Sequence, residues 1–138
     1  MALATDIIAI TDARNAFPTG SRVICDPAPT GTDEDWVALV RSDPTARMVE
    51  AGFSQDGSPE FYTGNDNGGF RSWRKGDLNI VTTESQEFFE LFETATILAK
   101  RFNLHDKVDR IALFQAVLYN VCWHNLEVPT LEYIEGMA

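Results

Sequence analysis

The run Asp33-Glu34-Asp35-Trp36-Val37-Ala38-Leu39-Val40 decides the fold, because its acidic start gives way at once to five apolar residues. A compact apolar run between charged residues predicts a buried strand over 36–40. Side chains at positions i and i+2 of a strand point to the same side, so Asp33 and Asp35 would present two carboxylates together where the strand begins. We therefore expect a buried strand with a pair of acids at one end.

The segments around this strand alternate between helical and strand patterns. The first part of the chain predicts a helix over 5–16, an irregular loop over 18–31 that contains a short strand at 23–25, and then the strand over 36–40. A short helix over 45–51, a polar loop over 55–69 and strands over 70–83 that break near Gly76 follow. The last part predicts a helix through 88–102, with a capping box at Thr83 and Gln86, and a second amphipathic helix after Asp106. This order predicts an α+β fold, in which helices cover a small mixed β-sheet on at least one face.

Length and composition predict a single globular domain over residues 1–138. The chain has 138 residues, of which 44% are apolar and 23% are charged, as in ordinary globular domains. Eleven Lys and Arg against 21 Asp and Glu give a net charge of −10. Because nucleic acid is bound chiefly through basic side chains, this balance argues against an extended nucleic-acid track. The acidic balance is compatible with small ligands that bind together with Mg²⁺, because carboxylates are ligands that Mg²⁺ prefers.

The sequence also predicts a cytoplasmic protein with no membrane partner. Its first residues lack the basic start of a secretory signal, and no apolar segment reaches the length of a membrane span. Cys25 and Cys122 lie far apart in the chain, so we expect reduced thiols and no disulfide.

A Gly20-Ser21 turn precedes the acid pair and gives the pair a chemical context. Backbone N–H groups and a hydroxyl at such a turn can hold phosphate oxygens, and glycine allows close approach. Two adjacent carboxylates repel each other unless a cation lies between them, and a divalent metal carrying a triphosphate is a common solution. The alternative is a solvated turn before the strand, which Asp33 and Asp35 alone would fit as well.

With Gly20-Ser21 followed by Asp33-Glu34-Asp35 at the head of an apolar strand, the sequence resembles the nucleotidyltransferase superfamily that includes DNA polymerase beta. It looks most like small phage-type proteins predicted to be minimal nucleotidyltransferases, and the runs at 70–79 and 109–119 add to this likeness, which covers 17–119. The resemblance implies a minimal nucleotidyltransferase-like fold. It also implies that Gly20 and Ser21 hold the phosphates of a nucleotide triphosphate (NTP), and that Asp33 and Asp35 hold one or two Mg²⁺ or Mn²⁺.

In such enzymes a third carboxylate from a later strand helps to activate the attacking hydroxyl. Asp77 is the candidate for this third catalytic residue beside Asp33 and Asp35. If Asn79 occupies the position instead, a carboxylate has been lost there, and the site would bind without transferring.

Four cations lie where they could meet phosphates, since guanidinium forks match phosphate oxygens; they are Arg22, Arg71, Arg74 and Lys75. We assign Arg22 and Lys75 to nucleotide binding, while a solvated strand face is the alternative for 71–75. Trp73 could stack on a base, although an aromatic residue in a strand is more often core.

Two features depart from the family pattern. Glu34 stands where an apolar residue is usual, and on a strand it would point toward the covered face of the sheet at a desolvation cost. The loop after Ser21 usually includes a short helix, but Pro27 and Pro29 allow at most one turn of it.

The leading hypothesis is therefore a Mg²⁺-dependent nucleotidyltransferase-like protein, which binds an NTP and transfers a nucleotidyl group to a hydroxyl of an acceptor, either protein or RNA. The alternative is a non-catalytic phage interaction protein that keeps the fold and some nucleotide affinity. The Gly-Ser turn and paired acids favour the enzyme, whereas Glu34 and Asn79 favour the alternative.

Overall fold

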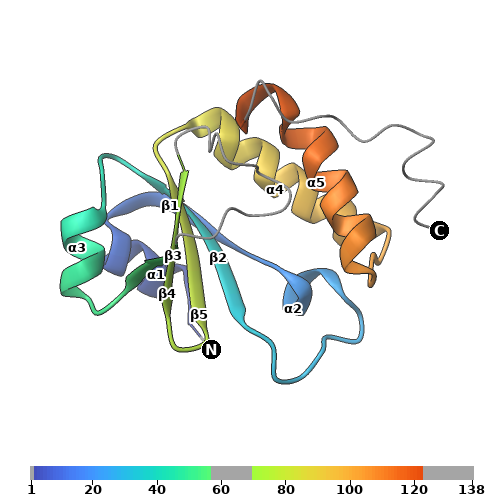
Figure 1. Cartoon of the computed structure of the whole chain (residues 1–138), viewed down its shortest axis with the longest axis horizontal. Coiled ribbons are helices and arrows are strands. Elements are labelled where there is room, and N and C mark those ends of the chain that lie inside the picture. Colours follow the sequence, from blue (N-terminus) through green and yellow to red (C-terminus); the bar gives the residue numbers. More distant parts are fainter. Residues whose placement is uncertain (1, 57–69, 123–138) are drawn as a thin grey trace.

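The computed structural model describes residues 2–56 and 70–122, and it confirms the α+β prediction (Figure 1). Within these residues the elements are α1 (Ala4–Thr11), β1 (Ala13–Thr19), α2 (Ser21–Ile24), β2 (Glu34–Val40), α3 (Thr45–Glu50), β3 (Ser54–Asp56), β4 (Phe70–Lys75), β5 (Leu78–Thr83), α4 (Gln86–Arg101) and α5 (Lys107–Cys122). Most of the polar loop predicted over 55–69 lies outside the described residues.

The strands form one mixed sheet in the order β1-β2-β5-β4-β3. Strand β2 runs parallel to β5, and the other neighbouring pairs are antiparallel. Because β2 lies between β1 and β5, both of its edges are hydrogen-bonded. This arrangement brings three chain segments together at the amino end of β2: that end itself, the carboxyl end of β1 and the amino end of β5.

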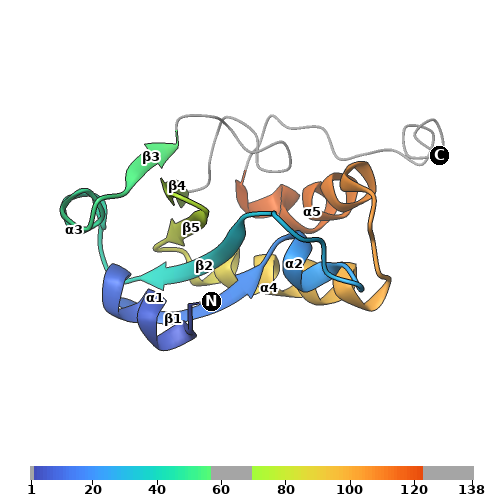
Figure 2. The same ribbon diagram turned by 90° about the horizontal axis from the view of Figure 1, so that it is seen from below.

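Helices cover both faces of the sheet, which explains why β2 is apolar at every position from Trp36 to Val40 (Figures 1 and 2). Trp36, Ala38 and Val40 belong to the core beneath α1 and α3. Val37 and Leu39 belong to the second core, beneath α2, α4 and α5. Side chains that alternate along one strand therefore enter different cores.

The prediction of one helix over 5–16 was wrong in its second half. Helix α1 ends where Asp12 adopts a left-handed conformation with φ 55°. Residues 13–19 then pair with residues 35–40 of β2, with a register shift between Ala13 and Asn15. Pro18 is tolerated because β1 is an edge strand, so a missing N–H on its outer side breaks no ladder.

Two smaller predictions also need correction. Residues 23–25 were expected to form a strand, but Val23 and Ile24 donate backbone hydrogen bonds to the Gly20 carbonyl and close the single helical turn of α2. The cap of α4 is Ser85, whose hydroxyl accepts from the Phe88 N–H at 3.1 Å, so the capping box at Thr83 was wrong.

The other predicted elements are confirmed: the strand through 36–40, the short helix after Pro44, the strands broken near Gly76, and the two long C-terminal helices. None of the helices in the described part of the chain combines the length and the apolarity needed to cross a membrane.

Candidate functional site

A row of polar side chains crosses the sheet at the amino end of β2. The strand register places its four members side by side; they are Thr19, Asp35, Asn79 and Arg74. The Thr19 hydroxyl lies 2.8 Å from that of Thr96 on α4, and both are buried. The row therefore lies on the sheet face that α2, α4 and α5 cover, at the edge of that core.

Gly20 follows this row directly and begins the turn into α2. Its φ of +81° is a conformation that other residues rarely adopt. A Cβ at this position would lie 2.1 Å from Asp35 Oδ2, closer than any two such atoms can approach. Glycine is thus required here because the Asp35 carboxylate lies against the backbone of the turn, beside the half-buried Ser21.

Asp35 is held from its other side by an amide. Asn79 Nδ2 donates to Asp35 Oδ1 at 3.1 Å, and the Ser72 hydroxyl donates to Asn79 Oδ1 at 3.3 Å. Ser72 is buried on the same face of β4. The three side chains form a polar chain that runs across the sheet from β4 to β2.

The second acid of the pair, Asp33, lies just before β2 and is more exposed. Its Oδ2 accepts from the Arg74 guanidinium at 3.0 Å, and both side chains are about two-fifths exposed, 43% and 42% respectively. Arg22 is fixed in the neighbouring loop, where its guanidinium donates to the carbonyl and the hydroxyl of Thr32. Two cations therefore accompany the two carboxylates.

The environment of Asp35 raises the pKa of its carboxyl group above the ordinary value. Burial is the main cause, and the negative charge of Asp33 adds to it. The hydrogen bond from Asn79 and the charges of Arg74 and Arg22 lower the pKa but do not cancel the rise. A cation placed near this carboxylate would favour its ionised form.

The structure brings together most of the predicted site residues: Gly20, Ser21, Arg22, Asp33 and Asp35. The predicted third acid is differently placed. Asp77 lies in the exposed turn between β4 and β5, and its backbone carbonyl accepts from the Glu34 N–H at 2.8 Å. The side chain that contacts Asp35 from β5 is Asn79, so an amide occupies that position.

Lys75, which we assigned to nucleotide binding, lies on the opposite face of the sheet. Its ammonium donates to the Ala51 carbonyl at 2.8 Å and lies 5.8 Å from the centre of the Phe53 ring. Strand alternation is the reason, because Arg74 points to the face of Asp35 and its neighbour must point away. Trp73 points away as well and is fully buried, so it belongs to the core and cannot stack on a base.

Glu34 also points to the opposite face, but the expected desolvation cost is offset. Its carboxylate is only partly buried and accepts from the Ala2 N–H at 2.8 Å. Sequence reasoning overlooked two supporting residues, Ser72 and Thr32. Ser72 could have been noticed as a small polar residue between a basic and an aromatic residue of a predicted strand. No sequence pattern pointed to Thr32.

The donor set fits a Mg²⁺ ion that brings further ligands with it. Among residues 2–56 and 70–122, no group of three or more His, Cys, Asp or Glu side chains is placed to hold a metal ion. Mg²⁺ commonly takes only one or two carboxylates and completes its shell with waters and substrate phosphates. Asp33 and Asp35 suit that mode as two carboxylates at the amino end of β2, beside the turn at Gly20 and Ser21.

No protein-family model, curated protein or solved structure matches the chain. The likeness to nucleotidyltransferases therefore stays a prediction from the sequence, and the functional argument depends on the geometry of the row and its turn.

Proposed function

We propose that the protein binds an NTP together with one divalent cation, Mg²⁺ or Mn²⁺, at the amino end of β2. The observation that carries this proposal is the contact between the Asp35 carboxylate and Gly20, because it sets a half-buried acid directly against a turn able to receive phosphate. Asp33 and Asp35 would hold the cation, and Gly20 and Ser21 would hold phosphate oxygens.

The charges around the site support a ligand that carries both signs. A divalent cation would relieve the repulsion between Asp33 and Asp35, while phosphate oxygens offer new partners to Arg22 and Arg74. A nucleotide triphosphate with its metal supplies both at once. A cytoplasmic location, as the sequence predicts, would give the protein access to such complexes.

Asn79 favours binding without transfer. Activation of an acceptor hydroxyl needs a group that can take its proton, and an amide cannot. The position opposite Asp35 on β5 therefore holds a side chain that orients the carboxylate and does no proton chemistry. We propose nucleotide binding as the principal function for this reason.

Nucleotidyl transfer is the second candidate, since the Gly20-Ser21 turn and the paired acids, from which the sequence predicts it, lie together. In that reaction the acceptor oxygen bonds to the α-phosphorus, the bond to the β-phosphate oxygen breaks, pyrophosphate leaves, and the acceptor proton passes to a base. The candidate for this base is Asp77, in the turn beside Glu34.

Binding is tested by calorimetry with Mn²⁺ and a non-hydrolysable NTP analogue. The double variant Asp33→Asn/Asp35→Asn removes both charges while keeping the shape, so affinity should fall by roughly a hundredfold, about 2.7 kcal/mol. The matched control is Asp43→Asn, which removes an acid at the opposite end of β2 and should leave affinity unchanged. Equal affinity in the wild type and the double variant would overturn the proposed function.

Transfer is tested separately, by incorporation of label from each of the four α-labelled NTPs into protein or RNA of a cell lysate. Absence of labelling by a wild type that binds nucleotide supports the binding function. Labelling that falls about a hundredfold in Asp77→Asn would support the enzyme and assign Asp77 the proton transfer. Labelling unchanged in Asp77→Asn would keep the enzyme and reject that residue.

A further inference from the structure

The orientation of the Asn79 amide is determined by its two neighbours. An ionised carboxylate only accepts hydrogen bonds, so the side of the amide that faces Asp35 must be its NH₂ group. The other side, Oδ1, accepts from the hydroxyl of Ser72, which is 4% exposed. Both contacts favour the same orientation, and strand pairing holds all three residues in line.

This amide limits where a cation can approach Asp35. Oδ1 already accepts from Asn79 at 3.1 Å, and Oδ2 lies against Gly20. A cation on the Asn79 side would meet amide hydrogens, which carry partial positive charge and repel it. The open approach is therefore the one shared with Asp33.

Asp33 is itself engaged in the free protein. Its Oδ2 is paired with Arg74, and Arg22 lies close enough to influence Asp35. The two carboxylates and the two guanidinium groups balance one another in charge, so a free cation gains little by entering. A triphosphate would offer Arg74 and Arg22 new partners, and the carboxylates would then be available to the metal.

We propose that Asn79, oriented by Ser72, restricts the site to a single divalent cation whose uptake depends on a bound nucleotide. Asn79 acts as a specificity-determining residue because it excludes a second cation, and Ser72 is a positioning residue that acts through it. This inference rests on the proposed function, and it adds the number of cations and the coupling between cation and nucleotide.

The test counts Mn²⁺ per chain by electron paramagnetic resonance, with and without a non-hydrolysable ATP analogue at saturating concentration. The wild type should hold one Mn²⁺ per bound nucleotide. Its affinity for Mn²⁺ alone should be at least tenfold weaker than with nucleotide present, and by linkage Mn²⁺ should tighten nucleotide binding by the same factor.

The decisive variant is Asn79→Asp, which places a carboxylate where the amide was. It should bind Mn²⁺ without nucleotide at least tenfold more tightly than the wild type and hold a second Mn²⁺ when nucleotide is bound. Asn15→Asp is the matched control, because Asn15 is an exposed residue of β1 and the change in charge is identical. It should leave both quantities unchanged.

Three further variants keep the inference falsifiable if Asn79→Asp does not fold. Asn79→Ala opens Asp35 Oδ1 without adding charge, and should raise the affinity for free Mn²⁺ about threefold or more. Ser72→Ala should weaken the coupling between Mn²⁺ and nucleotide, whereas Ser72→Thr keeps the hydroxyl and should restore it. A merely structural role would lower stability in these variants without changing the coupling.

The outcomes separate this inference from the function beneath it. Two Mn²⁺ per nucleotide in the wild type, or free Mn²⁺ bound as tightly as with nucleotide, would overturn the single-cation inference and leave nucleotide binding intact. The single-cation inference would also be overturned if Asn79→Asp and the wild type had the same affinity for free Mn²⁺ and bound the same number of Mn²⁺ per nucleotide. A wild type that binds no Mn²⁺ and nucleotide together would overturn the proposed function itself.

Discussion

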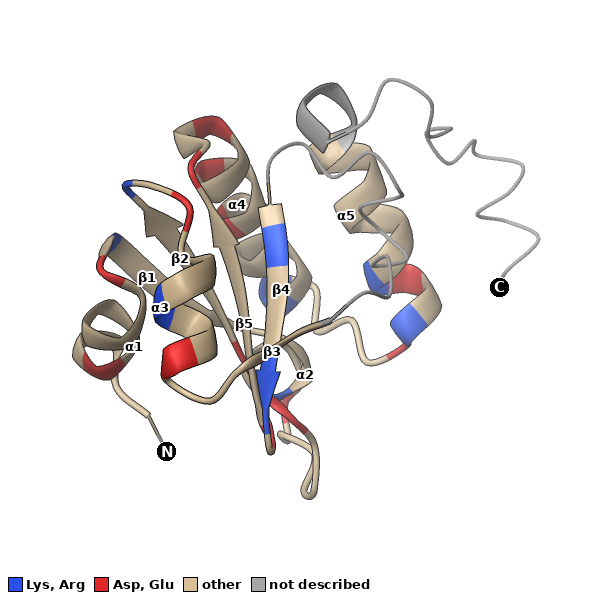
Figure 3. Cartoon of the chain, turned by 60° about the vertical axis from the view of Figure 1, so that its left-hand side comes forward, with Lys and Arg blue, Asp and Glu red and all other residues tan. Residues whose placement is uncertain are grey.

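Each end of β2 carries an aspartate paired with an arginine of β4, yet only one end resembles a binding site. Arg74 pairs with Asp33 before β2, and Arg71 pairs with Asp43 beyond its other end. Basic residues occur toward both ends of β4, as Figure 3 shows. Since 71 and 74 differ by an odd number of positions, the two arginines point to opposite faces of the sheet.

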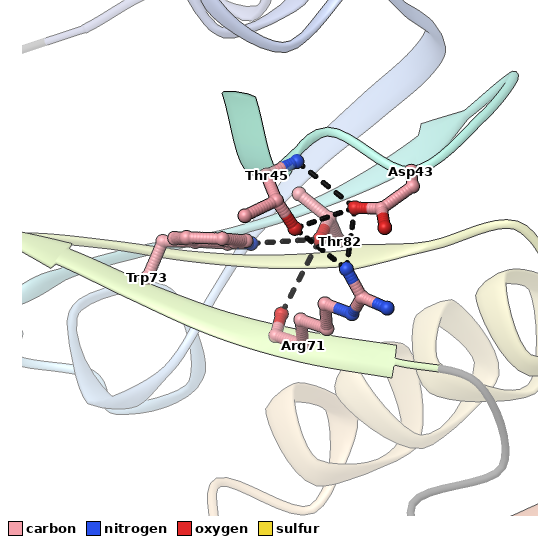
Figure 4. Close-up of polar contacts among 5 residues, drawn as sticks. All are labelled: Asp43, Thr45, Arg71, Trp73 and Thr82. Carbon is pink, nitrogen blue, oxygen red and sulfur yellow. Dashed lines mark hydrogen bonds and ion pairs between the residues drawn. The ribbon is translucent and has the colours of Figure 1, made fainter. Parts of the chain in front are cut away.

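The Asp43 end is satisfied by the protein's own donors (Figure 4). Asp43 Oδ1 accepts from the Arg71 guanidinium and from both the backbone N–H and the hydroxyl of Thr45. These hydrogen bonds, led by that of Arg71, hold the pKa of Asp43 well below its ordinary value. Beneath them the Trp73 indole N–H donates to the buried Thr82 hydroxyl at 2.9 Å.

The Asp33 end differs because a second carboxylate, that of the half-buried Asp35, lies beside the ion pair. The pKa of Asp35 is raised, while that of Asp43 is lowered. An aspartate that the protein stabilises as an anion is a structural link, here holding α3 to the sheet. One whose charged form is disfavoured by burial, as at Asp35, would gain from a ligand that brings a cation to it. The arginine alone does not distinguish the two ends.

Phe92→Ala should have the largest effect on stability. Its loss of unfolding free energy is the reference for the smaller losses expected from variants at either end of β2. Phe92 is 1% exposed and packs edge-on against Phe114 in the core beneath α4. Its truncation should lower the free energy of unfolding by about 3–5 kcal/mol in urea denaturation. Ile97→Ala, on the same helix but 52% exposed, is the control and should cost far less. A loss below roughly 1 kcal/mol for Phe92→Ala would contradict its place in the core.

Gly20→Ala should have the second largest effect, because it removes the close contact between residue 20 and the Asp35 carboxylate, which has no counterpart at the Asp43 end. The new Cβ would displace the Asp35 carboxylate, so nucleotide affinity should fall at least tenfold, and stability should fall by roughly 1–3 kcal/mol. Gly31→Ala is the matched control: Gly31 also has a positive φ, +71°, but no atom lies within 4 Å of its added Cβ. If both variants bind nucleotide equally well, the close contact with Asp35 has no role in binding.

Arg74→Gln and Arg71→Gln test the two ion pairs directly. Both remove a charge from β4 and one partner from an aspartate. Arg74→Gln should weaken binding of the Mn²⁺–nucleotide complex roughly tenfold, about 1.4 kcal/mol, because a phosphate partner is lost. Arg71→Gln should leave binding unchanged and lower the melting temperature slightly. Equal binding losses, measured by calorimetry, would erase the distinction between the two ends.

The smallest expected effects are opposite dependences of stability on pH. Because the pKa of Asp35 is raised on folding, its contribution to stability falls as pH rises from the ordinary carboxyl value, 3.8, through the folded value. The lowered pKa of Asp43 makes a contribution that is present above that ordinary value and is lost as pH falls toward the folded value.

Melting temperatures between pH 3 and pH 7, without metal or nucleotide, measure both dependences. Relative to the wild type, Asp35→Asn should be more stable near pH 7, and Asp43→Asn should be less stable there. Both differences should shrink toward pH 3. Differences of the same sign at pH 7 would show that the two carboxylates have similar environments after all.

The sequence by itself determined the features that depend on local periodicity. The unbroken apolar run after Asp35 predicts a buried strand, and the three- and four-residue spacing from Phe88 onward predicts a helix with one buried side. The i, i+2 spacing of Asp33 and Asp35 likewise predicted two acids on one side, and the Asp33 effect on Asp35 agrees with it. These patterns recur within a few residues and need no knowledge of distant partners.

Only the tertiary structure decided which distant residues meet. Residues 13–19 form a strand because β2 offers a partner along their whole length, a gain in hydrogen bonding that no local pattern records. The register between β2 and β5 places Asn79 opposite Asp35 and leaves Asp77 in the turn. A register shifted by one residue would turn every side chain of β5 to the other face, so the character of this site depends on long-range strand pairing.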